Sequence, residues 1–240
     1  APGRKMKTRH NILSCLYKML RDAVAQEMLL AVPNFPADFS KSKIPDPDWR
    51  WIDQETQNLL LENLDDEIAY FIYFLMSHGC RPSEARALQH QDIDEKNMTI
   101  TFRRTFSDDT LRHIKNKKIR TVPVDEIWLD IYQARRKSDE LPGAFVFTYK
   151  GKPLKEYHAR NKWRYAQRKA GVQINLYSAT RHSLASQAAI RVTSLYLIQR
   201  FLGHTDSRTT ERYSHVNVNS LKAVQRHDNV IRLSSKHKSK

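Results

Sequence analysis

Arg81 is the first residue whose neighbours suit it to chemistry. It follows Gly79, which we expect to end a helix, and it precedes Pro82, which can begin the next one. Glu84 lies three residues further on, at the spacing that brings two side chains together on a helix. The pair is either a surface ion pair or a guanidinium held rigid by a carboxylate so that its planar fork can grip a phosphate.

A second basic group, Arg181-His182, falls in the first turn of a helix predicted over 180–191. The N-terminus of a helix attracts anions, because its amides are free and its dipole end is positive. Basic side chains are disfavoured there, so their presence indicates an anionic ligand. Ordinary surface placement is the alternative.

A Leu-Gly-His turn at 202–204 is followed, nine residues after the histidine, by Tyr213. Gly203 is expected to end one helix, and Asp206 or Ser207 can cap the next. His204 is therefore predicted at a helix junction and Tyr213 near the end of a short helix. Histidine or tyrosine alone is usually structural, whereas this spacing is specific.

These motifs, in this order, resemble those of the tyrosine recombinases, the phage integrase family, in the catalytic domain. The resemblance implies an enzyme with the catalytic residues Arg81, Lys115, Arg181, His204 and the nucleophile Tyr213, supported by Glu84 and His182. The family places its lysine eight residues before the proline of a Val-Pro strand. Here Pro123 points to Lys115, with Lys117 and Lys118 as less favoured substitutes.

The resemblance implies cleavage and rejoining of DNA strands by a site-specific recombinase or integrase. Two arginines and a histidine would stabilise the charge on the scissile phosphate while the tyrosine attacks it and the lysine protonates the departing 5′ oxygen. The product would be a 3′-phosphotyrosyl link, made without a cofactor, a metal or ATP. Two alternatives remain: a DNA-binding protein of the same fold that does not cleave, and an enzyme like the type IB topoisomerases.

Ser178 departs from the family pattern, which has histidine or lysine three residues before the second arginine. Serine cannot accept a proton as imidazole does near neutral pH. Either His182 or a water held by Ser178 takes over, or the step is slower, or the chain belongs to a subgroup without the histidine. Tyr177 is a further neighbour that could contribute a hydrogen bond.

Composition favours a polyanionic partner. The 240 residues carry 41 Lys and Arg against 26 Asp and Glu, a formal charge of +15, with 40% hydrophobic residues. No apolar run approaches the roughly 20 residues that a membrane span needs, and two cysteines make no disulfide framework. Asp92 and Asp94 are interpreted as part of a turn rather than a metal site. A cytoplasmic, nucleoid-associated protein of a prokaryote, phage or mobile element is expected.

Double-stranded DNA is the predicted partner. Charge is uneven: 51–70 is acidic, whereas 103–120, 150–181 and 222–240 are basic. The helix predicted over 154–169 offers the candidate DNA contacts Lys155, Arg160, Lys162, Arg164 and Arg168. The resemblance also implies a homo-oligomer on DNA, a tetrameric synapse in which the segment after the tyrosine is exchanged between subunits; packing of that segment on its own subunit is the alternative.

The predicted fold class is mainly α with a small antiparallel β-sheet (α+β), as in the catalytic domain of the family. Alternation at 98–102 and 119–124 predicts the strands, with turn residues at 107–109 between them. Apolar periodicity and end signals predict the helices 8–32, 53–64, 67–78, 82–88, 125–137, 154–169, 180–191, 195–202, 206–213 and 217–227.

A proline-rich stretch, 33–47, is interpreted as a linker. Residues 1–47 then resemble the last helix of the family's core-binding domain plus a tether, with most of that domain outside the sequence. The catalytic domain is predicted at 48–228, followed by a basic tail, 229–240, expected to be disordered.

Overall fold

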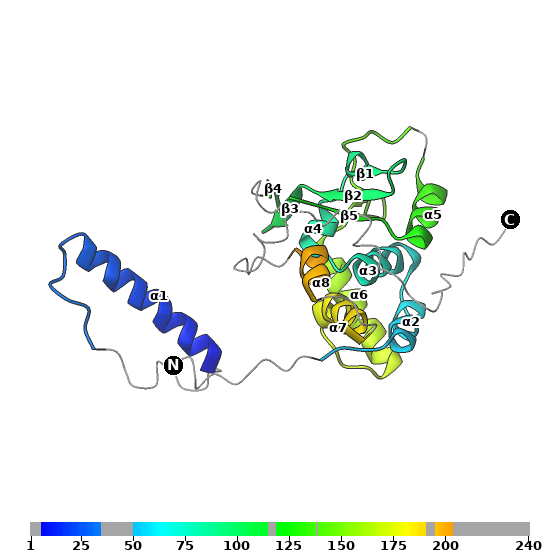
Figure 1. The fold of residues 1–240 in the computed structure, drawn as a ribbon. Helices are drawn as coiled ribbons and strands as arrows, with labels where there is room; N and C mark the ends of the chain where they lie inside the picture. The colour runs from blue at the N-terminus through cyan, green and yellow to red at the C-terminus, as the bar shows by residue number, and fades with distance from the viewer. Residues whose placement is uncertain (1–5, 35–49, 115–118, 138, 191–194, 204–240) are drawn as a thin grey trace. The chain divides into compact units, whose positions relative to one another are not determined.

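The computed structural model describes residues 6–34, 50–114, 119–137, 139–190 and 195–203 (Figure 1). The chain divides into two compact units, Ala1–Asp48 and Trp49–Lys240. In the first unit, helix α1 spans Met6–Ala25. The helix predicted over 8–32 therefore ends early: the chain turns at Glu27, whose φ is +58°, and the amides of Glu27 and Met28 close the helix end.

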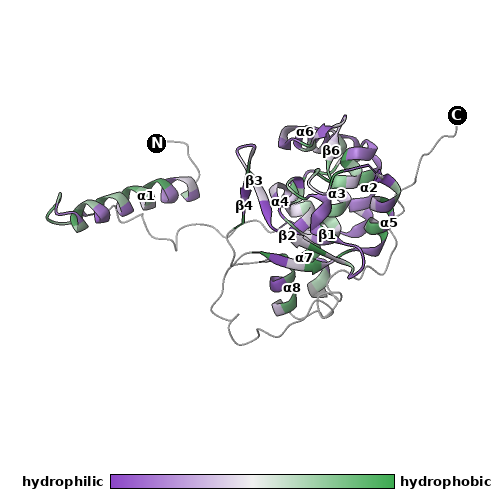
Figure 2. Cartoon of the chain, turned by 90° about the horizontal axis from the view of Figure 1, so that it is seen from above, coloured by the Kyte–Doolittle hydropathy of each residue, from purple (hydrophilic) through white to green (hydrophobic). Residues whose placement is uncertain are grey.

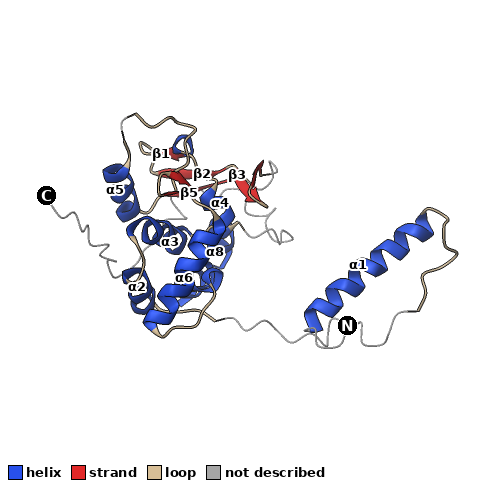
Figure 3. Cartoon of the chain, turned by 180° about the vertical axis from the view of Figure 1, so that it is seen from behind, coloured by secondary structure: helices blue, strands red, loops and turns tan. Residues whose placement is uncertain are grey.

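The second unit is helix-rich with small antiparallel sheets, which confirms the predicted fold class. Its helices are α2 (Gln54–Glu62), α3 (Asp66–His78), α4 (Pro82–Arg86), α5 (Glu126–Arg135), α6 (Glu156–Ala170), α7 (Ser183–Ile190) and α8 (Leu195–Leu202). A 3-10 turn η3 covers His90–Asp92 and a π-helical turn η5 covers Ser178–His182. Figure 3 shows the strands between residues 93 and 123 gathered at one side of these helices.

Helix α3 forms the centre of the core. Every residue from Ile68 to His78 is buried, because this helix is apolar nearly all round and other elements cover it. Tyr70 stacks on Trp128 of α5 with ring centroids 5.6 Å apart, and Phe74 packs against the same indole at 4.8 Å. Gly79 ends α3 in the left-handed conformation, as predicted, with φ +57°.

The main sheet has the order β1-β2-β5, with β1 at Ile93–Asp94, β2 at Thr99–Phe102 and β5 at Arg120–Pro123. The pairing of β2 with β5 is antiparallel, with Ile100 opposite Val122 and Phe102 opposite Arg120. The predicted strands are thus confirmed. A further small pair joins β6 (Thr148–Tyr149) to β7 (Lys152–Pro153).

The turn at 107–109 belongs to a hairpin of its own, which the sequence pattern did not predict. Strands β3 (Arg104–Ser107) and β4 (Thr110–His113) pair with each other, and Asp108 and Asp109 close them with φ of +49° and +57°. Two consecutive residues with positive φ form a tight two-residue hairpin, so the chain folds back at once. Figure 2 shows hydrophilic residues along this hairpin.

Candidate active site

Arg81 lies where the sequence places it, as the N-cap of α4 with Pro82 in the first turn. Its Nη1 donates to Oε1 of Glu84 at 2.9 Å, and its backbone N–H donates to Oε2 of the same carboxylate at 3.1 Å. The side chain of Arg81 is 43% exposed, whereas that of Glu84 is buried. The guanidinium is therefore held from one side and open to solvent on another.

Glu84 has a second guanidinium partner that the sequence motifs did not include. Nη2 of Arg120, from strand β5, donates to Oε2 of Glu84 at 2.7 Å. Burial on its own would raise the pKa of the Glu84 carboxyl, but the charges and hydrogen bonds of Arg120 and Arg81 outweigh it and lower the pKa to about 2. Glu84 is thus an anion that joins two arginines.

Arg181 is completely buried. Its Nη1 donates to the carbonyl of Gly79 at 2.7 Å and its Nη2 to the carbonyl of Leu202 at 2.7 Å. Burial lowers the pKa of the guanidinium, but arginine remains charged at any ordinary pH. One side chain therefore connects the turn before Arg81 with the end of α8.

The two glycines of these turns permit close packing. A Cβ built on Gly79 would lie 2.5 Å from Cδ2 of Leu202 and 2.7 Å from Cδ2 of Leu184. A Cβ on Gly203, whose φ is +69°, would lie 2.8 Å from Cδ of Arg120. A larger residue would require the Leu202 and Leu184 side chains to move at the first position and the Arg120 side chain at the second.

The helix start predicted at 180 is wrong. Helical conformation begins earlier, since the Asn175 side chain accepts from the amide of Ser178 at 2.8 Å and the Asn175 carbonyl accepts from the amide of Ala179 at 3.0 Å. Arg181 and His182 lie inside the π-helical turn η5, past the free amides. The predicted attraction of an anion to this pair by a helix N-terminus is therefore wrong, and Arg181 is held by carbonyls instead.

Ser178, at the position where the family has histidine or lysine, is buried in the same turn. Tyr177 and His182 contact each other edge to face, with ring centroids 4.9 Å apart. Burial, and then the charge of Arg181, lowers the pKa of His182. Both causes favour the neutral imidazole and make it a weaker proton acceptor than a histidine in water.

Three of the predicted catalytic residues, Lys115, His204 and Tyr213, lie outside the described residues, as do the substitutes Lys117 and Lys118. The described chain reaches the segments next to two of them. Ile114, just before Lys115, donates its amide to the carbonyl of Arg103 at 2.8 Å and so closes the β3–β4 hairpin. Gly203, just before His204, packs on Arg120.

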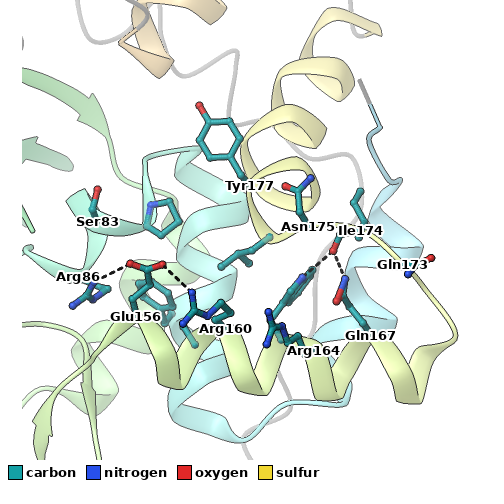
Figure 4. A pocket seen from close by; sticks show the side chains of 15 residues that line it. Ser83, Arg86, Glu156, Arg160, Arg164, Gln167, Gln173, Ile174, Asn175 and Tyr177 are labelled. Carbon is teal, nitrogen blue, oxygen red and sulfur yellow. Dashed lines mark hydrogen bonds and ion pairs between the residues drawn. The ribbon is translucent and has the colours of Figure 1, made fainter. Parts of the chain in front are cut away.

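Beside Arg81 lies a cavity of about 530 Å³ between α4, α6 and the segment 173–177 (Figure 4). Pro82, Trp163 and Tyr177 are among its lining residues. Of the proposed DNA contacts on α6, Arg160 and Arg164 line this cavity, and Arg160 is near Glu156, with Nη1 and Oε1 3.9 Å apart.

The other α6 candidates are spread around that helix. Lys162 pairs with Asp65, its Nζ 2.9 Å from Oδ2, and so contacts the acidic segment instead of the cavity. Lys155 is the N-cap of α6, and Arg168 lies in its last turn. All five remain predictions as DNA contacts.

Arg86 is another residue that the sequence motifs missed. Its guanidinium is buried, donates to the Leu154 carbonyl at 2.8 Å and to Asp109 at 2.7 Å, and lies 4.9 Å from the Phe106 ring centroid. It therefore fixes the tip of the β3–β4 hairpin to α4. In the sequence, Arg86 stands out only because it lies five residues after Arg81. That spacing does not reveal its partner Asp109, which lies 23 residues further along the chain.

Asp92 has a structural role in the fold. Its carboxylate pairs with Arg103 at 3.1 Å and with Arg104, and Asp94 accepts from the amide of Asn97 in the β1–β2 turn at 2.9 Å. Within the described ranges there is no group of three or more His, Cys, Asp or Glu that could hold a metal ion. None of the described helices is long and apolar enough to cross a bilayer.

The helical fold, the small sheet and the gathered arginines define a tyrosine recombinase catalytic domain. The sequence profile of the phage integrase family matches residues 50–220, and the chain belongs to this family.

Curated relatives include transposases and recombinases. Transposase B from transposon PsiTn554 of Staphylococcus aureus is 28% identical over 225 residues, covering 88% of this chain and 34% of that protein. Tyrosine recombinase XerA of Pyrococcus furiosus is 31% identical over 161 residues, covering 65% of this chain and 52% of XerA. The chain thus spans about a third to a half of the length of these relatives.

Solved structures share the fold. The Tn1549 transposon integrase in complex with circular intermediate DNA matches with a TM-score of 0.69 at 18% identity, covering 94% of this chain and 80% of that one. The XerA recombinase matches with a TM-score of 0.52 at 22% identity, covering 72% of this chain and 62% of XerA.

Proposed function

We propose that this protein is a site-specific DNA recombinase or integrase that cuts and rejoins DNA through Tyr213. One observation carries the proposal: Arg181 donates to the carbonyls of Gly79 and Leu202, so segments far apart in the sequence meet at one guanidinium. These segments lead directly into Arg81 and His204. A phosphate bound there would meet groups from each of the motifs that resemble the family.

In the proposed reaction the phenol oxygen of Tyr213 attacks the scissile phosphorus while its proton passes to a base. The bond from phosphorus to the 5′ oxygen breaks, and Lys115 supplies the proton that this oxygen takes up. Arg81, Arg181 and His204 stabilise the charge that grows on the non-bridging oxygens. Attack of a 5′ hydroxyl of another strand on the 3′-phosphotyrosyl link reverses these steps, and no bond energy is lost.

The guanidiniums supply the positive charge in this route, which uses neither a metal nor ATP. Arg81 is half-exposed and can meet the phosphate from solvent, while each terminal nitrogen of Arg181 keeps one further N–H beyond those given to carbonyls. In place of the usual histidine or lysine, neutral His182 or a water at Ser178 takes the phenol proton.

The test is covalent trapping on nicked suicide DNA, followed by a denaturing gel in the presence of a chelator. The wild type is expected to give a slowly migrating protein–DNA adduct, and Tyr213→Phe to give none because phenylalanine lacks the attacking oxygen. An identical adduct from Tyr213→Phe would refute the proposal. A chelator that abolishes the adduct would refute the metal-free route.

A second candidate is a DNA-binding protein of the same fold that does not cleave, which the serine at position 178 favours. It predicts binding with a steep salt dependence and no covalent species. A topoisomerase of type IB would instead form the adduct and relax supercoiled DNA without a partner site. The synaptic tetramer and the exchange of the segment after Tyr213, which lies outside the described residues, belong to the proposal for the recombinase.

A further inference from the structure

We propose that Arg120 is a positioning residue of this site: through Glu84 it holds the Arg81 guanidinium, and through its own stem it supports the turn that leads to His204. The inference rests on the proposed function, because it assigns a role within the same reaction. Arg120 belongs to none of the sequence motifs. It lies on strand β5, between the predicted catalytic residue Lys115 and Pro123.

Arg120 is itself fixed by its surroundings. The side chain is nearly buried, 11% exposed, and its guanidinium carbon lies 4.5 Å from the ring centroid of Phe102, the residue directly opposite on β2. A guanidinium over an aromatic face gains a cation–π attraction that grows with burial. The pairing of β5 with β2 and the contact with the Phe102 ring therefore hold the Arg120 guanidinium in place independently of Glu84.

The carboxylate of Glu84 joins Arg120 to Arg81 and so fixes the position of the Arg81 guanidinium. Oε2 accepts from Arg120 at 2.7 Å and from the Arg81 amide at 3.1 Å, while Oε1 accepts from the Arg81 guanidinium at 2.9 Å. Both oxygens are thereby engaged, and the carboxylate has no room to rotate without breaking a charged hydrogen bond. Arg81 alone could not fix Glu84, because its own side chain is partly exposed.

Arg120 also touches the other end of the site. The hydrogen of Gly203 faces its stem so closely that a Cβ there would lie 2.8 Å from Cδ and 3.1 Å from Nε. The Nε–H of Arg120 is buried and has no acceptor in the described part of the chain. Arg120 thus contacts the Glu84 carboxylate and the glycine next to His204 at once, so its loss would disturb two motifs that are distant in sequence.

The test compares Arg120→Met, which keeps a long stem without charge, with Arg120→Lys, which keeps the charge. Single-turnover adduct formation on suicide DNA and the Kd for uncut DNA are measured for each. We expect Arg120→Met to slow adduct formation by about 100-fold with a Kd within about threefold of the wild type, since small misplacement of a phosphate-binding group costs about this much. Arg120→Lys should restore part of the rate.

Arg136→Met is the matched control. Arg136 also pairs with a glutamate, Glu95 at 2.8 Å, and lies over an aromatic ring, that of Tyr132 at 5.9 Å, but among the described residues no ion pair or ring contact joins it to a motif residue. Its rate of adduct formation should equal that of the wild type. A loss in Arg120→Met that is explained by its unfolded fraction in a thermal melt, or an equal loss in Arg136→Met, would overturn the inference.

A double-mutant cycle that combines Arg120→Met with Glu84→Gln tests whether Arg120 acts through Glu84. If Arg120 acts through Glu84, the double variant is no slower than the slower single variant, whereas independent effects multiply. Full multiplication would overturn the part of the inference that runs through Glu84.

The pH–rate profile gives a readout that a purely structural role would not move. The charged or titratable groups that act on Glu84 are Arg81 on its own element, Arg120 from β5, Arg181 from η5 and the Cys80 thiol. Protonation of Glu84 releases Arg81, so the rate falls as pH drops through its pKa. Without Arg120 that pKa rises, and the acid limb of Arg120→Met should shift to higher pH; an unshifted limb counts against the inference.

The two proposals fail differently. A wild type that forms no adduct overturns the proposed function and this inference with it. A wild type that forms the adduct, together with an Arg120→Met variant that forms it equally fast, overturns this inference alone.

Discussion

Two arginines of the site are held in opposite ways. Arg181 is fully buried and donates to two backbone carbonyls, whereas Arg81 is 43% exposed and donates to one carboxylate. Carbonyl acceptors do not titrate and belong to the backbone of two different turns. Arg181 therefore stabilises the fold as well as carrying charge, while Arg81 is an adjustable group whose position depends on an ionised partner.

Removal of Arg181 should have the largest effect. Arg181→Ala leaves the buried carbonyls of Gly79 and Leu202 without donors, so we expect the free energy of unfolding to fall by about 3 kcal/mol. Adduct formation should fall by about 1,000-fold or more while DNA binding is largely kept. Urea titration, the trapping gel and a DNA-binding assay measure these three quantities.

The same substitution at the exposed site is the control. Arg81→Ala should also slow adduct formation strongly, by about 100-fold, yet lower the stability by only about 1 kcal/mol, because Glu84 keeps Arg120 as its partner. Equal losses of stability in Arg81→Ala and Arg181→Ala would show that Arg181 stabilises the fold no more than Arg81 does.

The stability that Glu84 provides should depend on pH. The pKa of Glu84 is lowered from 4.5 to about 2 in the folded protein, so the stabilisation it gives is fully present above about pH 4.5 and is lost as pH falls toward 2. This difference corresponds to about 3 kcal/mol at neutral pH. The stability gap between wild type and Glu84→Gln should therefore be wide at pH 7 and narrow at pH 3, by urea denaturation.

Arg181, whose hydrogen-bond acceptors are carbonyls, should make a contribution to stability that does not depend on pH. The stability gap between wild type and Arg181→Lys should not change between the same two pH values, because neither the guanidinium nor its acceptors titrate there. A Glu84→Gln gap that stays constant with pH would mean that the carboxylate does not depend on the two arginines for its charge.

A further prediction concerns the close packing around Gly79, whose carbonyl Arg181 binds. Gly79→Ala should cost about 1 kcal/mol for its left-handed backbone and a further 1–3 kcal/mol for the contacts with Leu202 and Leu184. Gly171→Ala is the matched control: Gly171 has φ +69°, and no atom packed on it from the described part of the chain lies within 4 Å of the place that the alanine methyl would take, so only the backbone cost remains. Equal thermal shifts for the two variants would show that the α3–α8 contact is not tight.

The parts of the site that depend on neighbouring residues were predictable from sequence. Gly79, Pro82 and the Arg81–Glu84 pair follow from caps and i,i+3 spacing, which local chemistry determines. Arg120 was not predictable, because its partner lies 36 residues earlier and the contact exists only when β5 pairs with β2.

The errors have the same origin. The turn residues at 107–109 were assigned to the pair of strands around them, but the short strands β3 and β4 pair locally and the longer-range pairing of β2 with β5 forms outside them. The helix near Arg181 was expected to begin at 180, but Asn175 caps the chain earlier and a π-helical turn follows. Side-chain capping by asparagine and an extra residue in a turn leave little mark in apolar periodicity.

Cys80, between Gly79 and Arg81, gives the site a chemical reporter. Its thiol is completely buried, and burial, followed by the charge of Glu84, raises its pKa, whereas Cys15 on α1 is exposed. Alkylating reagents attack the thiolate form. In the folded protein Cys15 should thus be labelled first. The slower rate at which Cys80 is labelled, with or without DNA, would report how often the structure around Arg81 and Arg181 opens.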